Sequence, residues 1–337
     1  MNSLLRGWMQ RLAPTVETSM TQRGAGAGCS FSELVRLHSC AAALWEMPPP
    51  GQSAPVGGEL KSLFRGHGLE YTETRTYQAG DDIRSMDWRV MARTSIPHIK
   101  IFQEEKERAV YLIVDHGPSM HFGTRQCFKS VQASRLGALL AWAAMESGEK
   151  VAGMVIKPLK NHETRPLSGQ RGVVPLLKNM VVDPETDLID STCQDRCFPA
   201  GLQQVLQWVR KGSLIFLVSD FYHYDQHMEK ILYELQRHRN VALLLVFDPL
   251  ENHSLPQGRY RISDGRAMLQ LNDADTLTRN RHCKAFQQRR QAIEEFSRQH
   301  RLRMACISAQ QDALQALQGA LQQWAQQDTR EIRHALR

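Results

Sequence analysis

The chain has 337 residues, of which 42% are hydrophobic and 23% charged, so it can bury one substantial core and a smaller appended unit. No apolar stretch reaches the ~18 residues of a membrane helix, and the N-terminus lacks the apolar block of a secretory signal, so we expect a cytoplasmic protein without a membrane span. The cysteines are odd in number and scattered, which argues against a disulfide framework. Cys193 and Cys197 are the only close pair, and they indicate zinc only weakly.

Most of the formal net charge of +7 lies between Arg279 and Arg303. A basic face of this kind attracts nucleic acid. The same segment carries Phe286, Ile293 and Phe296 at helical spacing, which favours a surface helix with a solvated basic side. We therefore do not expect nucleic acid among the partners.

The first 58 residues are predicted to be loosely attached to the rest. Residues 4–12 and 31–45 have the pattern of short helices, and residues 48–58 form a proline- and glycine-rich linker. Residues 59–108 follow as a second unit, in which 71–77 and 99–104 alternate as exposed strands of a small antiparallel β unit.

Strands and helices then alternate through residues 109–325, which predicts an α/β fold with a doubly wound, mostly parallel sheet flanked by helices. The expected strands are 109–115, 150–156, 213–220, 240–248 and 303–308, and the expected helices are 128–147, 173–182, 202–210, 228–239, 279–300 and 313–324. Asp264 and Gly265 between two alternating runs predict a β-hairpin insertion at about 257–272, and residues 326–337 are left as a tail.

Three of the apolar runs end in an aspartate, namely Asp115, Asp220 and Asp248. Such runs are typical of parallel strands buried on both faces, and ligands of these sheets bind beyond the carboxyl ends of the strands. The aspartates are therefore expected to crowd one end of one sheet.

Carboxylates and hydroxyls at such a position are ligands for a divalent cation. Asp115, Ser119 and Asp220 are the candidate metal ligands, but Gly117 offers no side-chain oxygen between the first two. Any magnesium is therefore expected to bind weakly, with a dissociation constant of about millimolar or worse. A metal-dependent hydrolase that uses the strand-end aspartates remains the alternative, although Gly117 also removes the second acid of a phosphatase and Ser119 lacks the full glycine-flanked elbow of a nucleophile.

Apolar, aromatic and imidazole side chains surround these positions and are of the kind that anchors protein interfaces. The predicted partner-binding rim consists of His116, Met120, His121, Phe122, Phe221 and Tyr222.

Residues ahead of the first buried strand carry a specific signature. It consists of Arg65–Glu70 (RGHGLE), Arg75–Arg89 (RTYQAGDDIRSMDWR), Ala92-Arg93 and Lys100–Glu105 (KIFQEE), and Ser219-Asp220-Phe221 and Asp248–Glu251 (DPLE) follow in order. From about Lys61 to Trp324 the chain closely resembles the bacterial "domain of unknown function 58" family.

This resemblance implies a von Willebrand factor A-like domain that is paired with an AAA+ ATPase of the MoxR type. Such pairs are thought to act as chaperones or assembly factors for client proteins, so the implied role is binding and not catalysis. Relatives with an intact metal-ion-dependent adhesion site have serine where Gly117 stands and threonine in a loop that here reads Cys197–Gly201 (CFPAG). The implied metal site is therefore degenerate. Many members have membrane helices before the signature, and none is expected here.

The signature itself is expected to be structural. Gly80 permits a left-handed turn, Asp81 and Asp82 can cap the turn that follows, and Asp87, Arg75 and Arg93 suit a half-buried ion-pair network around Trp88 that holds the small β unit against the sheet. A partner surface is the alternative role of these residues.

Overall fold

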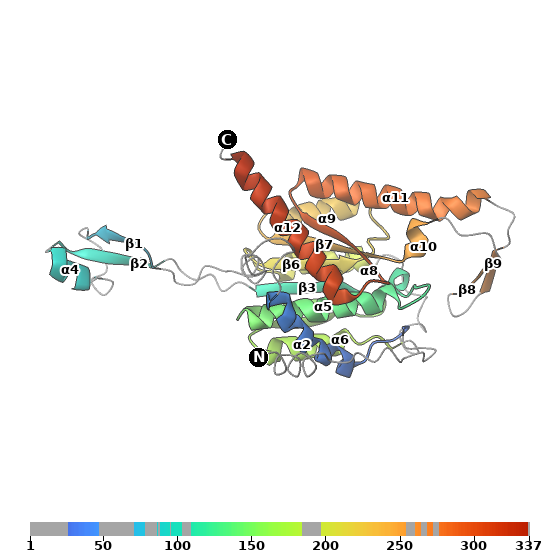
Figure 1. Cartoon of the computed structure of the whole chain (residues 1–337), viewed down its shortest axis with the longest axis horizontal. Coiled ribbons are helices and arrows are strands. Elements are labelled where there is room, and N and C mark those ends of the chain that lie inside the picture. Colours follow the sequence, from blue (N-terminus) through green and yellow to red (C-terminus); the bar gives the residue numbers. More distant parts are fainter. Residues whose placement is uncertain are drawn as a thin grey trace, which may run out of the picture.

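A six-stranded, mostly parallel sheet forms the centre of the protein (Figure 1). The computed structural model describes residues 26–46, 71–77, 86, 88–94, 96–102, 109–183, 197–253, 260–263, 268–271 and 276–335. The strands are β3 (Ala109–Asp115), β4 (Lys150–Ile156), β5 (His162–Leu167), β6 (Leu214–Ser219), β7 (Asn240–Phe247) and β10 (Arg303–Ser308). Their order across the sheet is β10-β7-β6-β3-β4-β5, and only β5 runs antiparallel to its neighbour. The predicted doubly wound α/β fold is confirmed, and the strand order reverses between β3 and β6.

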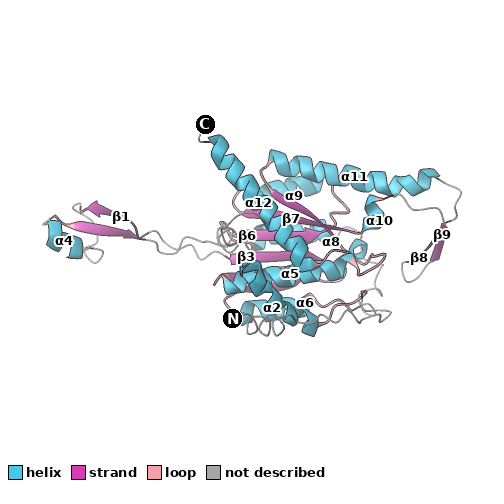
Figure 2. Ribbon diagram, in the orientation of Figure 1, coloured by secondary structure: helices cyan, strands magenta, loops and turns pink. Residues whose placement is uncertain are grey.

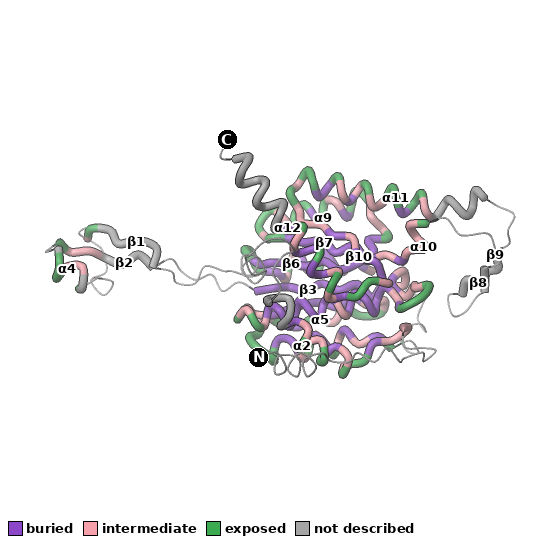
Figure 3. Tube along the Cα trace, viewed as in Figure 1, coloured by how far each residue is buried: buried purple, intermediate pink, exposed green. Residues whose placement is uncertain are grey.

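Helices cover both faces of this sheet, so the sheet is the middle layer of three (Figure 2). One face is covered by α2 (Phe31–Glu46), α5 (Lys129–Glu146), α6 (Gln170–Asn179) and α12 (Ala313–Ala335), and the other by α8 (Cys197–Trp208), α9 (Gln226–Gln236) and α11 (Thr276–Gln299). Within β3, Val110, Leu112 and Val114 face the first set, whereas Tyr111 and Ile113 face the second. Because both faces are covered, β3 is buried along its whole length, which explains its continuous apolar run (Figure 3).

The N-terminal helix belongs to the core of the domain, and the expectation of a loosely attached segment is wrong for residues 31–46. Leu34 and Ala41 of α2 are fully buried in the layer formed with α5. The indole Nε1 of Trp142 donates to the carbonyl of Leu34 at 3.0 Å, and Arg135 pairs with Glu33 at 2.7 Å. The helix predicted at 4–12 and the linker at 48–58 lie outside the described residues.

Several helices begin or end at residues other than those predicted from the sequence. The segment predicted as a loop at 197–201 is the first part of α8, and α12 continues to Ala335, through most of the predicted tail. The pair β8 (Tyr260–Ser263) and β9 (Met268–Leu271) forms the predicted antiparallel hairpin. The short helices η2 (Pro118–Met120) and α10 (Pro249–Asn252) follow β3 and β7.

The small β unit is present, but its tryptophan is not buried. Strands β1 (Tyr71–Thr76) and β2 (His98–Phe102) pair antiparallel, and α4 (Trp88–Thr94) lies between them in the chain. Trp88 is 61% exposed and Arg93 is exposed as well, so the expected half-burial of these two residues is wrong. Gly80, Asp81, Asp82 and Asp87 and the side chain of Arg75 lie outside the described part of the chain.

If α2 is an integral layer of the domain, Leu34→Ala should lower the free energy of unfolding by about 2–5 kcal/mol, because it removes a buried side chain and leaves a cavity. Val35→Ala on the partly exposed side of the same helix is the control, with an expected change of about 0.5 kcal/mol. Urea unfolding of both variants measures the difference, and equal midpoints would show that α2 does not contribute to the core.

Since Trp88 is exposed, Trp88→Ala should change the free energy of unfolding by about 1 kcal/mol or less. Thermal unfolding of the two proteins compares them directly. A loss of about 3 kcal/mol would instead indicate that the indole packs against another part of the chain.

Candidate functional site

Three neighbouring parallel strands, β3, β6 and β7, bring the predicted aspartates to the candidate site. Asp115 is the last residue of β3, and Asp220 directly follows β6, which is hydrogen-bonded to β3 in parallel. Asp248 follows β7, the next strand. The carboxyl ends of these strands therefore carry the three aspartates to one end of the sheet, as predicted.

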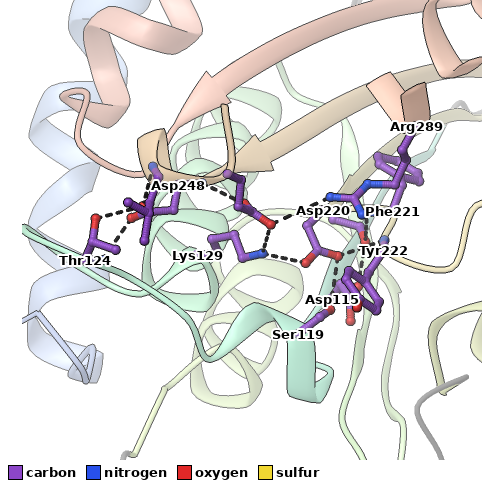
Figure 4. Close-up of polar contacts among 12 residues, drawn as sticks. Asp115, Ser119, Thr124, Lys129, Asp220, Phe221, Tyr222, Asp248 and Arg289 are labelled. Atoms are coloured by element: carbon purple, nitrogen blue, oxygen red, sulfur yellow. Dashed lines mark hydrogen bonds and ion pairs between the residues drawn. The ribbon is translucent and has the colours of Figure 1, made fainter. Parts of the chain in front are cut away.

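Both carboxylate oxygens of Asp220 accept hydrogen bonds from neighbouring groups of the protein (Figure 4). Its Oδ2 accepts from the Lys129 ammonium at 2.7 Å, and its Oδ1 accepts from Ser119 Oγ at 3.1 Å and from the backbone amide of Tyr222 at 3.0 Å. Burial raises the pKa of Asp220, but the positive charges of Lys129 and Arg289 outweigh this and hold it below its ordinary value. Asp220 is therefore ionised and neutralised inside the protein.

Lys129 is the centre of this arrangement, although it is the first residue of α5 and only 2% exposed. Its ammonium also donates to Glu251 Oε1 at 3.0 Å. Burial lowers the pKa of Lys129, but the charges of Asp220 and Glu251 more than offset this and raise it above its ordinary value. We call Asp115, Ser119, Lys129, Asp220 and Glu251 the strand-end cluster.

Asp248 orients the second carboxylate of the cluster. Asp248 is the N-cap of α10 and forms a capping box in which its own amide donates to Glu251 Oε2 at 2.9 Å. The carboxylate of Asp248 also accepts from the amide and the hydroxyl of Thr124 at 2.9 and 2.7 Å. The third aspartate therefore shapes the site and does not contact Lys129 in the observed hydrogen bonds.

Asp115 has a different environment. Its Oδ1 accepts from the amide of Gly117 at 2.7 Å and its Oδ2 from Ser219 Oγ at 2.5 Å, and it is 2% exposed. Burial, and then the charge of Asp220, raise the pKa of Asp115 to about 7. This carboxyl group therefore binds a proton up to about neutral pH, unlike Asp220.

The residues do not fit the divalent metal that the sequence resemblance to von Willebrand factor A-like domains implies. The Lys129 ammonium already contacts Asp220 Oδ2 at 2.7 Å, where a cation would have to bind. A Cβ atom at Gly117 would lie 3.0 Å from both Cys197 Sγ and Asp115 Oδ1, so the space of the absent serine is occupied. In the described part of the chain, no group of three or more His, Cys, Asp or Glu residues could hold a metal ion.

The predicted partner-binding rim requires correction at three of its six positions. His116, Met120 and Phe221 are buried and cannot contact a partner directly. The His116 ring bonds Ser134 Oγ at 2.9 Å, and burial, with Lys157 and His121, lowers its pKa well below the ordinary value. Local sequence could not reveal this burial because the covering residues come from α5 and α8.

Phe221 has a structural role instead. Its ring packs edge-on against Phe198 at 5.8 Å between centroids, and its φ of 47° lies in the left-handed region that is strained for a non-glycine residue. Phe221 lies between Asp220 and Tyr222 in the chain. The left-handed turn at Phe221 accompanies the hydrogen bond from the amide of Tyr222 to the carboxylate of Asp220.

Tyr222 is the exposed aromatic residue of the rim, at 55%. The Arg289 guanidinium lies 5.2 Å from the centre of its ring and 3.7 Å from Glu251 Oε1. His121 and Phe122 are partly exposed, and Phe122 lies 5.7 Å from the Lys129 ammonium. An exposed aromatic side chain held over a charged network can serve as an anchor for a partner protein.

Sequence reasoning missed Lys129, Glu251 and Arg289. The available signal for Lys129 is that it is the single lysine of a helix whose buried face is otherwise uncharged. No local signal distinguishes Arg289 from the other basic residues of α11.

A family model described as "Protein of unknown function DUF58" matches residues 73–292, which is more than half of the chain. The chain belongs to this family. The match covers most of β1, the strand-end cluster and most of α11.

Uncharacterized proteins of Mycobacterium bovis and Mycobacterium tuberculosis are 26% identical to the chain over 200 residues, which is 57% of this chain and 59% of theirs. The chain therefore matches less than two thirds of the length of these relatives. A conserved hypothetical protein, BatB, from Bacteroides thetaiotaomicron resembles the structure with a TM-score of 0.39 at 13% identity, over 65% of this chain and 99% of BatB. Among the described residues, no helix combines the length and the apolar character needed to span a membrane.

The raised pKa of Asp115 predicts a pH dependence of stability. Between about pH 4 and 7 the folded protein holds a proton on Asp115 that the unfolded chain has released, so the contribution of Asp115 to stability is lost as the pH rises through this range. Asp115→Asn imitates the protonated acid and does not titrate. Its free energy of unfolding relative to wild type should therefore rise with pH, by at most about 1.4 kcal/mol per pH unit, and level off above pH 7.

Chemical denaturation of both proteins at several pH values provides the measurement. A constant difference across this range would show that Asp115 titrates normally in the folded state.

Proposed function

We propose that this protein is a non-enzymatic binding module that works with an AAA+ ATPase of the MoxR type in the assembly or maturation of a client protein. Family membership is compatible with this role, and the resemblance of the signature to ATPase-associated members supports the choice of partner. The proposed contact surface is the strand-end surface around Tyr222, His121 and Phe122.

The proposal rests mainly on the observation that the carboxyl and hydroxyl groups of the strand-end cluster are hydrogen-bonded to other groups of the protein. The Asp220 carboxylate is bonded to Lys129, Ser119 and a backbone amide, and Ser119 donates its hydroxyl to that carboxylate. Asp115 is buried and bonded to Ser219. A general base or nucleophile must be able to reach a substrate proton or electrophile, whereas these groups are engaged with one another.

The alternative function is a metal-dependent hydrolase that uses Asp115 and Asp220. It requires a divalent cation at a place where the ammonium of Lys129 lies 2.7 Å from Asp220. Turnover of a phosphoester by the purified protein, dependent on added metal, would favour this alternative over a binding role.

Tyr222→Ala should weaken binding of the MoxR-type ATPase or the client by about 1 kcal/mol or more, which is roughly fivefold or more in the dissociation constant. The reason is that the exposed ring is lost while the ion pairs beneath it remain. Biolayer interferometry with the purified ATPase from the native cell measures the change, and mass spectrometry after a pull-down from that cell identifies the client.

Tyr233→Ala is the matched control, since Tyr233 is 44% exposed on α9 and contacts His300 instead of the strand-end cluster. Its affinity should stay within about twofold of wild type. Phe221→Ala is unsuitable for this comparison because the ring is buried. Loss of binding after chelation of divalent metal, with Tyr222→Ala unchanged, would show that a cation and not the aromatic surface carries the contact.

A further inference from the structure

The ammonium group of Lys129 lies among the carboxylate oxygens of the strand-end cluster. The Lys129 ammonium is within 3.0 Å of two carboxylate oxygens that come from different elements, Asp220 Oδ2 after β6 and Glu251 Oε1 in α10. Both carboxylates have a second anchor, since Asp220 Oδ1 accepts from Ser119 and Tyr222 and Glu251 Oε2 accepts from the amide of Asp248. The oxygens are therefore held in place around the nitrogen.

The position of Lys129 in α5 makes this arrangement unusual. The N-terminus of a helix carries partial positive charge and disfavours a cation. Lys129 is the first residue of this 18-residue helix and is buried, so its charge is stable there only because two carboxylates surround it. Lys129 is the cation that both carboxylates contact at 3.0 Å or less, whereas Arg289 lies farther away, at 3.7 Å from Glu251 Oε1.

We propose that the Lys129 ammonium is the resident cation of the strand-end cluster, and that removing its side chain opens a site for a divalent cation held by Asp220 and Glu251. The wild-type protein then has no requirement for a metal, because its own side chain neutralises the carboxylates. This inference does not depend on any partner and goes beyond the proposed binding function.

The distances favour calcium over magnesium in the opened site. Calcium binds oxygens at 2.3–2.6 Å in flexible geometry, whereas magnesium demands 2.0–2.1 Å in a strict octahedron. The ammonium contacts of 2.7 and 3.0 Å are nearer to the calcium range, so smaller movements of the two carboxylates are needed.

Wild type, Lys129→Ala and Lys129→Met form the matched set for the test. Both substitutions remove the charge, but methionine fills the space of the lysine stem, whereas alanine leaves it open. Calorimetric titration with calcium chloride and with magnesium chloride measures binding, and thermal unfolding with and without each metal measures rescue.

We expect calcium to raise the melting temperature of Lys129→Ala by about 5–10 °C at about a hundredfold excess over its dissociation constant. Wild type and Lys129→Met should show no calcium-dependent shift. Adding Asp220→Asn to Lys129→Ala should abolish the gain, because one of the two carboxylates is then neutral.

Micromolar binding of calcium or magnesium by wild type would overturn the proposal, as would an equal shift in all three proteins. Lys129→Ala leaves Arg289 as the remaining nearby cation for the buried carboxylate of Asp220 and the partly exposed carboxylate of Glu251. The variant is therefore to be refolded in millimolar calcium if it is insoluble without metal. Lys129→Ser, whose hydroxyl can donate to a carboxylate, is the second variant. If neither variant binds calcium or recovers its fold with it, the proposal is wrong.

Discussion

The buried ammonium of Lys129 connects parts of the chain that lie far apart in the sequence. It joins the start of α5, the carboxyl end of β6 and the short helix α10 through ion pairs of 2.7 and 3.0 Å. Arg289 of α11 lies 3.7 Å from the same Glu251, and Asp248 fixes Glu251 through the capping box. Asp220 links Lys129 to the loop after β6, because its carboxylate accepts hydrogen bonds from Lys129, from Ser119 and from the backbone amide of Tyr222.

A buried ion-pair cluster can contribute little to the free energy of unfolding and still determine how the elements that it joins are arranged. Removing charges from water costs several kcal/mol per ion, and the attraction between buried partners often does no more than repay this cost. Loss of one partner is expensive, however, because the remaining charge stays buried and unpaired. The cluster therefore fixes how α5, β6 and α10 meet more than it adds to the stability of the fold.

Two carboxyl groups of this cluster, at the ends of adjacent strands, have pKa values shifted in opposite directions. Asp220 is ionised beside Lys129, whereas Asp115 retains its proton up to about pH 7, since burial raises its pKa and it has only hydroxyl and amide donors. Paired carboxyls with divergent pKa values are common in acid–base catalysis. Here the ionised member, Asp220, is bonded to Lys129, Ser119 and the amide of Tyr222, and the ring of Tyr222 is exposed beside it.

The amino-acid sequence by itself determined the layers of the fold. Apolar runs such as 109–115 and 214–219 identify strands covered on both faces, and their alternation with helices implies a parallel sheet whose carboxyl ends carry Asp115, Asp220 and Asp248. These features depend on periodicity within a few residues. The lack of a side-chain oxygen at Gly117 is likewise a local fact that the sequence alone states.

The tertiary structure decided which residues meet at this end of the sheet and which are covered. Lys129 is 91 residues from Asp220 and 122 from Glu251 in the chain, so no local pattern links them. Burial of Phe221 depends on Phe198 from α8, and the exposure of Trp88 and the packing of α2 on α5 depend likewise on which surfaces come together. Hydrophobic periodicity specifies that a face will be buried, whereas the packing of distant elements determines its partner.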